Sequence, residues 1–160
     1  MALALPVLTN ALVAALSKPN DSAAAAAQAI ADAYTTYAQG GQFLASTLAP
    51  LDAQGKVLAA TLLTGFSSLT LLGGCTGFET GLIAFWTGAI IIGAAPGATV
   101  NCPGAIGLSN IIAAAFASPQ PSGEVAAQVL ATILDTATRT VIGSVTIPGP
   151  PPVVTPTPII

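Results

Sequence analysis

The chain repeats one pattern at a spacing of 100 residues. Residues 8–38 align with residues 108–138 without a gap, and 11 of the 31 aligned positions are identical. Serine before an apolar-periodic run is a helix N-cap signal, and proline ends the helix before it. Each copy is therefore predicted to be an αα-hairpin, and together the copies favour a pseudo-symmetric bundle around the segment between them. Convergence of two alanine-rich hairpins is the alternative. The matched signals are Pro19/Pro119, Ser22/Ser122 and Gln28/Gln128.

Apolar residues recur at helical spacing through most of the remaining chain. One segment is apolar on every side, which is typical of a helix surrounded by others. We predict an all-α bundle of about five to six helices in one domain, residues 1–140. The expected helices run from Leu5 to Leu16, from Ser22 to Gln39, from Val57 to a stop at Gly73-Gly74, from Thr76 to Ile92 (the segment apolar on every side), from a cap at Asn101 or Cys102, and from a cap at Ser122.

The last 20 residues differ in character from the rest. β-Branched residues follow Arg139, and six prolines lie between residues 148 and 158. Residues 141–160 are predicted to leave the domain as an extended β/polyproline arm, in which the prolines beyond Pro148 forbid regular pairing. Such an arm would dock on a neighbouring subunit, and a disordered terminus is the alternative. The residues expected to bind the partner are Val141, Val145, Ile147, Val153, Val154, Ile159 and Ile160.

Charge is nearly absent from the chain. Charged residues make up 6% of the sequence, against about 25% in a typical soluble domain. The three basic residues are scattered and cannot neutralise a run of phosphates, so no nucleic acid is expected as a partner. Hydrophobic residues make up 53%, and the mean hydropathy is +0.82. A surface of this kind belongs in a membrane or inside a large assembly.

The membrane hypothesis rests on long uncharged runs. The 44 residues between Glu79 and Glu124 carry no charge, but their solid apolar block covers only Leu82 to Ile92. A bilayer span needs about 20 apolar residues, and no basic cluster sets an orientation. The assembly hypothesis is therefore favoured. A small membrane-embedded protein, such as a pore or holin-like factor, is one alternative, and a soluble helical module with an apolar binding pocket is another.

Residues suited to catalysis or metal binding are scarce. The chain has no histidine, which removes the usual general base and the commonest metal ligand. Cys75 and Cys102 have no second pair, so a zinc site is not expected. They would either form one disulfide or remain unpaired and buried, and burial is favoured. The run GAAPGATV at residues 93–100 lacks the lysine of a phosphate loop. We predict no catalytic residue, no metal and no cofactor.

Four short motifs carry a resemblance. They are FWTG at 85–88, CPGA at 102–105, L-x-N at 108–110 and Thr-Ala-Thr at 136–138 before a Pro-rich end. In these the chain resembles small, Ala/Gly/Thr-rich, charge-poor structural proteins of tailed bacteriophages and related contractile particles. The resemblance implies a non-enzymatic subunit of the virion, tail or baseplate, assembled in the host cytoplasm. Its partners would be other structural proteins of the particle and copies of itself.

Overall fold

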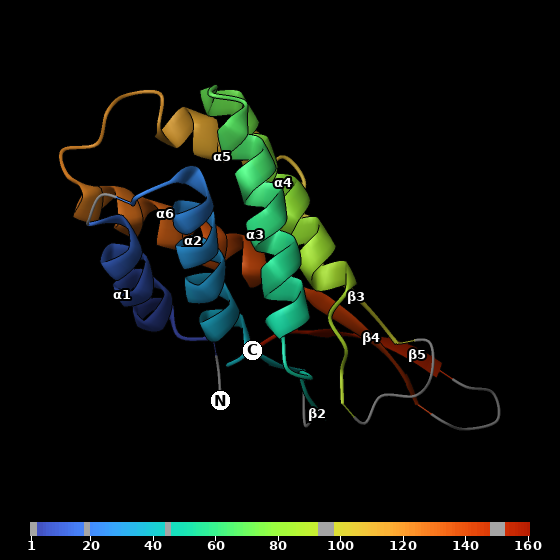
Figure 1. Ribbon diagram of the computed structural model, residues 1–160. Coiled ribbons are helices and arrows are strands. Elements are labelled where there is room, and N and C mark those ends of the chain that lie inside the picture. Colours follow the sequence, from blue (N-terminus) through green and yellow to red (C-terminus); the bar gives the residue numbers. More distant parts are fainter. Residues whose placement is uncertain (1–2, 18–19, 44–45, 93–97, 148–152) are drawn as a thin grey trace.

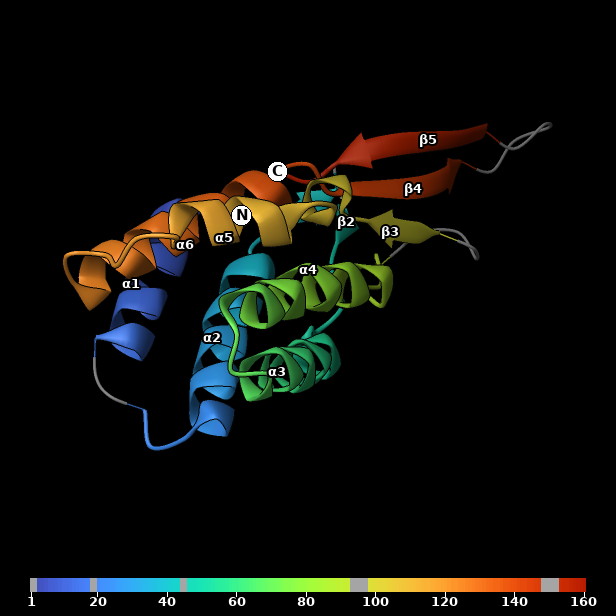
Figure 2. The ribbon, with the colours of Figure 1, turned by 90° about the horizontal axis from the view of Figure 1, so that it is seen from above.

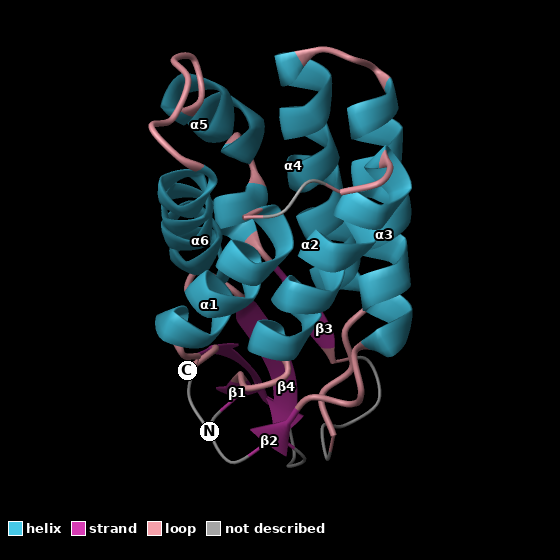
Figure 3. Cartoon of the chain, turned by 60° about the vertical axis from the view of Figure 1, so that its left-hand side comes forward, coloured by secondary structure: helices cyan, strands magenta, loops and turns pink. Residues whose placement is uncertain are grey.

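The structure is a computed structural model that describes residues 3–17, 20–43, 46–92, 98–147 and 153–160 (Figure 1). It is mostly helical, which confirms the predicted fold class, and short strands gather at one end of the helical body (Figure 3). The helices of the described residues are α1 (Leu5–Leu16), α2 (Ala23–Ala38), α3 (Asp52–Ser67), α4 (Leu71–Thr87), α5 (Leu108–Ala115), α6 (Gly123–Thr138) and the 3-10 turn η1 (Pro103–Ala105). The strands are β1 (Gln42–Phe43), β2 (Ser46–Thr47), β3 (Thr99–Asn101), β4 (Ile142–Ile147) and β5 (Val153–Pro158).

The six α-helices form a closed ring. Each helix packs against the next one along the chain, and α6 packs against α1 to close the ring (Figure 2). The contact between α5 and α6 is the loosest of the six. The two predicted hairpins thus flank α3 and α4, with α2 on one side and α5 on the other. Their second helices are placed differently, because α2 packs on α3 whereas α6 packs on α1.

The two hairpins have the same local structure. Ser22 and Ser122 accept hydrogen bonds from the backbone N–H groups three residues on, and both serines have extended backbones. The side chains of Asn20 and Gln120 each donate to the carbonyl five residues earlier, at the end of the first helix. Buried residues also match in register, for example Ile30 with Leu130. The predicted helix–turn–helix form of both segments is therefore confirmed.

A hydrogen-bonded chain crosses the centre of the ring. The Trp86 indole N–H donates to the Tyr34 hydroxyl at 2.8 Å, and the Tyr34 hydroxyl lies 2.6 Å from the Thr138 hydroxyl. Because Thr138 donates its own proton to the Leu134 carbonyl, the Tyr34 proton points to Thr138. All three side chains are fully buried, and they join α2, α4 and α6. Every polar atom of this chain is thus satisfied inside the core.

Glycines let α3 and α4 approach closely. A Cβ atom on Gly65 would lie 2.7 Å from the Gly73 carbonyl oxygen and 3.0 Å from the Gly77 Cα atom. Gly73 lies in the first turn of α4, where its N–H donates to the capping hydroxyl of Thr70. The expectation that Gly73-Gly74 ends the preceding helix is therefore wrong. The expectation that the apolar segment is surrounded is also wrong, because Ile83 on α4 is 39% exposed.

The fifth helix begins later than expected. Asn101 and Cys102 do not cap it; Pro103–Ala105 forms the separate turn η1, and α5 starts at Leu108. Gly107 precedes α5 with a φ of 80°, a left-handed conformation that glycine adopts without strain. The cap of this helix comes from α4 and is described below.

The described C-terminal residues are extended, as predicted, in β4 and β5, but they pair with their own chain and do not leave the domain. β4 pairs antiparallel with β3 and with β5, and Phe43 in β1 bridges to Ile159. Pro156 and Pro158 fit into the strand because β5 lies at the edge of the sheet. The backbone nitrogens of both prolines point away from β4, so neither needs to donate a hydrogen bond to it. The backbone N–H of Ile159, which points the opposite way, donates to the Val141 carbonyl. Residues 148–152 lie outside the described residues.

Candidate interaction surface

Most of the buried charge is used to hold helices together. Asp135, which is 6% exposed, accepts hydrogen bonds from the Arg139 guanidinium at 2.7 Å and from the Tyr37 hydroxyl at 2.5 Å. Asp135 and Arg139 stand four residues apart, a spacing that brings two side chains together on a helix, and they form a salt bridge. Burial, followed by the hydrogen bond to Asp135, raises the pKa of Tyr37, so the phenol stays protonated. This cluster ties α2 to α6 and leaves no free acid or base.

Glu79 on α4 caps α5. Its carboxylate accepts the backbone N–H groups of Gly107 and Ser109, each at 3.0 Å, and the Ser109 hydroxyl at 2.5 Å. These hydrogen bonds, with that of the Ser109 hydroxyl the largest, lower the pKa of Glu79 and keep the side chain ionised. An anion is favourable at this helix end because the first N–H groups of a helix lack partners. The only charge on the inner part of α4 is thus occupied within the chain.

The two helices of the second hairpin leave a groove on the outside of the ring, which we call the α5–α6 groove. Its two connected parts have volumes of about 350 and 440 Å³. Ile106 and Ile111 are 74% and 53% exposed on its wall. Among the described residues, none that lines either part is charged. The side chains that define the groove are Ile106, Ile111, Val129, Thr132, Ile133 and Thr136.

The two copies of the repeat differ at the groove. Ile111, Val129 and Ile133 occupy positions that hold alanine in the first hairpin, at residues 11, 29 and 33. Helix α1, with its alanines, packs against both α2 and α6, whereas α5 packs mainly on α4 and only loosely on α6. Larger apolar side chains therefore stand on the open side of the second hairpin. This difference was visible in the alignment and is the signal that sequence analysis missed.

The α3–α4 turn presents a second apolar feature at a different place. Leu69 is 93% exposed and has a φ of 55°, which is rare for leucine because its Cβ crowds the backbone. The neighbouring Leu71 and Leu72 are 51% and 59% exposed. None of the three lines the α5–α6 groove. The left-handed conformation at this position ends α3, and it leaves the leucine side chain exposed to solvent.

The residues that the sequence predicted to bind a partner do not belong to the α5–α6 groove or to the α3–α4 turn. Val141 and Ile159 are buried in their own domain, at 0% and 4% exposed, and cannot bind a neighbour. Ile160 is 53% exposed, but its backbone exchanges two hydrogen bonds with Gln42. Val145, Ile147, Val153 and Val154 belong to the paired strands β4 and β5, and their side chains are outside the description.

The cysteines are separate from the groove. Cys75 and Cys102 are both buried and free, so the disulfide is not formed and the favoured expectation of unpaired burial holds. Burial raises the pKa of the Cys102 thiol to about 11 and raises that of Cys75 as well. Among the residues that the structure describes, no three Cys, Asp or Glu side chains gather as metal ligands would. The absence of catalysis, metal and cofactor stays a prediction.

Comparison of the chain with models of protein families, with curated proteins and with solved structures finds no match. The resemblance to phage structural proteins therefore stays a prediction. Within the described ranges, none of the helices has the length and apolar character needed to cross a bilayer.

Proposed function

We propose that the protein is a non-enzymatic structural subunit of a virus particle, in the virion, tail or baseplate, and that it packs apolar surfaces against neighbouring copies of itself and other subunits. The observation that carries this proposal is the α5–α6 groove, which is open to solvent yet uncharged. Burying two exposed isoleucines stabilises a contact, because apolar surface removed from water contributes roughly 25 cal/mol per Å².

The α3–α4 turn supplies a matching partner on the same chain. Leu69 is an uncharged knob, and the groove is an uncharged recess of sufficient size for it. Because knob and groove are different surfaces, one copy would insert Leu69 into the groove of the next, and each copy would offer both halves. Such head-to-tail contacts build rings or filaments. Repeating contacts of this kind suit a particle built from many copies.

The sparse charge of the chain supports the same proposal. Of the described charged groups, Asp135 and Arg139 are paired with each other, and Glu79 is occupied in capping α5. Few charges then remain to keep copies apart in solution, since repulsion between like charges is what keeps many soluble proteins monomeric. The virus setting rests on the resemblance in sequence, whereas self-association rests on the groove and the turn.

The test is a pair of matched substitutions followed by sedimentation velocity over a range of concentrations. Ile111→Asp places an unpaired charge in the groove, where burial on association would be costly. Val57→Asp is the control, because Val57 is 46% exposed on α3 and lies outside the groove. We expect wild type and Val57→Asp to form concentration-dependent oligomers and Ile111→Asp to remain monomeric. Equal association of both variants would refute the role of the groove.

The virus setting needs its own measurement. Particles purified on a density gradient from cells that produce the protein should contain it at a fixed ratio to the other particle proteins, as mass spectrometry would quantify. Its absence from such particles, with self-association intact, would refute the virus setting and leave only an assembly subunit.

A further inference from the structure

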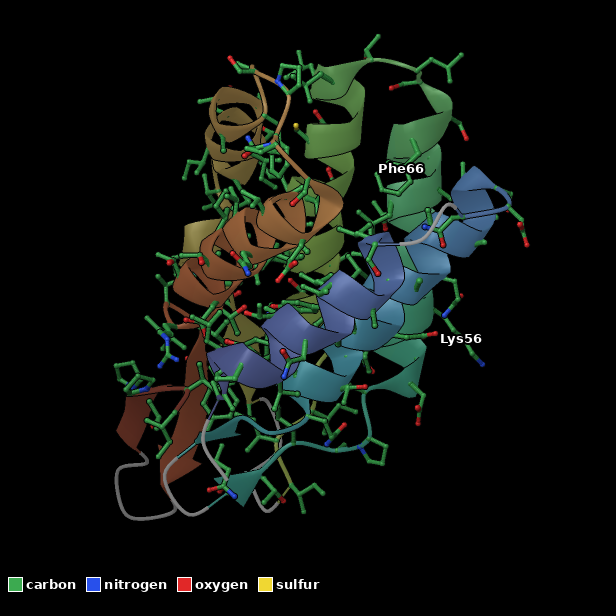
Figure 4. The ribbon with its side chains drawn as sticks, turned by 90° about the vertical axis from the view of Figure 1, so that its left-hand side faces the viewer. Lys56 and Phe66 are labelled. Carbon is green, nitrogen blue, oxygen red and sulfur yellow. The ribbon has the colours of Figure 1, made fainter. Side chains whose placement is uncertain are left out.

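An apolar cavity, open to solvent on one side, lies between the helices at the end of the ring nearest the α3–α4 turn. Its volume is about 230 Å³, and each of the helices α1, α2, α3, α4 and α6 contributes to its wall, as do Ile112 of α5 and Phe116 just after it. Phe66 of α3 lies near this end of the helix, whereas Lys56 on the same helix points to solvent (Figure 4). Phe66 and Phe78 meet edge to face with ring centroids 6.2 Å apart.

The described residues of the wall are almost entirely apolar. Every lining side chain is aliphatic or aromatic except Cys75, whose thiol is buried and has a raised pKa, so that it stays uncharged. A recess without hydrogen-bond partners does not hold ordered water well, and enclosed apolar cavities admit hydrocarbons or xenon. The chemistry of the wall therefore selects uncharged hydrocarbon.

The cavity also has an entrance. Leu71 at its rim is 51% exposed, and the side chains of Leu16, Phe66 and Phe116 around it are only partly buried. A ligand could thus reach the interior without unfolding of the ring. Two pairs of repeat-equivalent residues, Leu16 with Phe116 and Ile30 with Leu130, belong to the wall. The cavity is therefore a product of the way the two hairpins face each other.

Small residues keep the cavity open. Ala126 on α6 is part of the wall, and one larger side chain there would fill much of the space. Protein interiors are close-packed, with few voids larger than a water molecule, because lining atoms next to a void lose dispersion contacts. This space is open to solvent and is lined by residues from all parts of the ring, so a ligand can enter it.

We propose that this cavity binds the hydrocarbon part of an uncharged ligand, about nine non-hydrogen atoms in size when scaled from a cavity of about 150 Å³ that admits benzene. A short alkyl chain or a two-ring aromatic molecule has these dimensions. The hydrocarbon comes either from a free small molecule or from the end of a lipid chain that leaves through the entrance. This inference does not rest on the α5–α6 groove, because no residue that defines the groove lines the cavity, although Leu71 of the α3–α4 turn does line it.

The experiment is calorimetric titration of the full chain with naphthalene, together with variants that fill the cavity. Ala126→Leu adds three carbon atoms to the wall. Ala26→Leu is the matched control, since Ala26 occupies the same repeat position on α2, is equally half-buried and is not part of the cavity wall. Cys75→Met fills the space from α4 as a second variant. Circular dichroism checks that each variant is folded.

We expect wild type and Ala26→Leu to bind one naphthalene per chain, and Ala126→Leu and Cys75→Met to bind at least tenfold more weakly. The Ile112 methyl resonances should shift on binding, whereas those of Ile83, exposed on the outside of α4, should not. Competition by 1-octanol alone would assign the site to a small molecule, and competition by 1-hexadecanol as well would assign it to a lipid chain. The proposal is overturned if wild type shows no saturable binding, or if the folded filling variants bind as well as wild type.

Discussion

Replacing Leu69 by glycine should make the protein more stable and its assembly weaker. Leu69 is 93% exposed, so removing its side chain gives up almost no buried surface in the isolated chain. Its φ of 55° lies in the left-handed region, which costs a residue with a Cβ about 1–2 kcal/mol. Glycine avoids this cost but loses about 0.5–1 kcal/mol through its freer unfolded state.

The expected net gain for Leu69→Gly is therefore about 0.5–1 kcal/mol in the free energy of unfolding. For a chain of this length that corresponds to a rise in Tm of about 1–4 °C. Leu69→Ala is the matched control, because it removes the same apolar side chain while keeping a Cβ at the strained φ. Thermal unfolding is measured at a concentration where the protein is monomeric, since association shifts the apparent stability.

Sedimentation velocity then measures association of the same three proteins. Both variants should associate more weakly than wild type, because both lack the knob, while only Leu69→Gly should gain stability. A glycine variant no more stable than the alanine variant would refute the strain argument. A glycine variant that is more stable yet assembles as well as wild type would show that the leucine is not kept for docking.

Three further outcomes follow from the core and its caps. Tyr34→Phe should cost about 1–3 kcal/mol in chemical denaturation, because the buried N–H of Trp86 loses its acceptor; an unchanged midpoint would contradict the buried chain of hydrogen bonds. Gly65→Ala should lower the free energy of unfolding by about 1–3 kcal/mol, because the added Cβ overpacks the contact between α3 and α4. Gly74→Ala should raise it by about 0.5–1 kcal/mol, because its Cβ would only reach an ordinary contact at 3.7 Å. Equal effects of the two substitutions would argue against the close approach of α3 and α4. Glu79→Gln should lower the free energy of unfolding at neutral pH. Because the pKa of Glu79 is lowered in the folded protein, the stability that its carboxylate contributes is present above the ordinary carboxyl pKa of about 4.3 and is lost as the pH falls further. A pH series of denaturation midpoints should therefore show wild type and Glu79→Gln converging in acid.

Sequence predicted those parts of the fold whose causes are local. The serine caps and apolar periodicity of both hairpins are set by residues within a few positions of each other, and both hairpins form as expected. The start of α5 could not be predicted in this way. Its cap comes from Glu79, which lies 28 residues before Gly107 in the sequence and reaches it only because α4 packs against α5.

The C-terminal strand was missed for a related reason. The number of prolines argues against a strand in this segment. Pro156 and Pro158 are two residues apart, however, so their backbone nitrogens point the same way, and neither has to donate a hydrogen bond to β4. Only the pairing of β5 at the edge of the sheet reveals that these nitrogens face outward. The groove was missed because the substitution of alanine by Ile111 predicts a larger side chain but not the side of the ring on which it stands.

The buried polar contacts explain why the two copies of the hairpin are no longer interchangeable. The first copy supplies the donors Tyr34 and Tyr37, and the second supplies the acceptors Thr138 and Asp135. At the equivalent positions the second copy has Leu134 and Ala137, and the first has Ala38 and Thr35. Two first copies packed together would bury the tyrosine hydroxyls without these acceptors, at a cost of about 1–3 kcal/mol for each unsatisfied group. Two second copies would leave Asp135 with Arg139 but without its phenol. Pairing of unlike hairpins thus satisfies the buried hydroxyls, and it closes the ring within one chain.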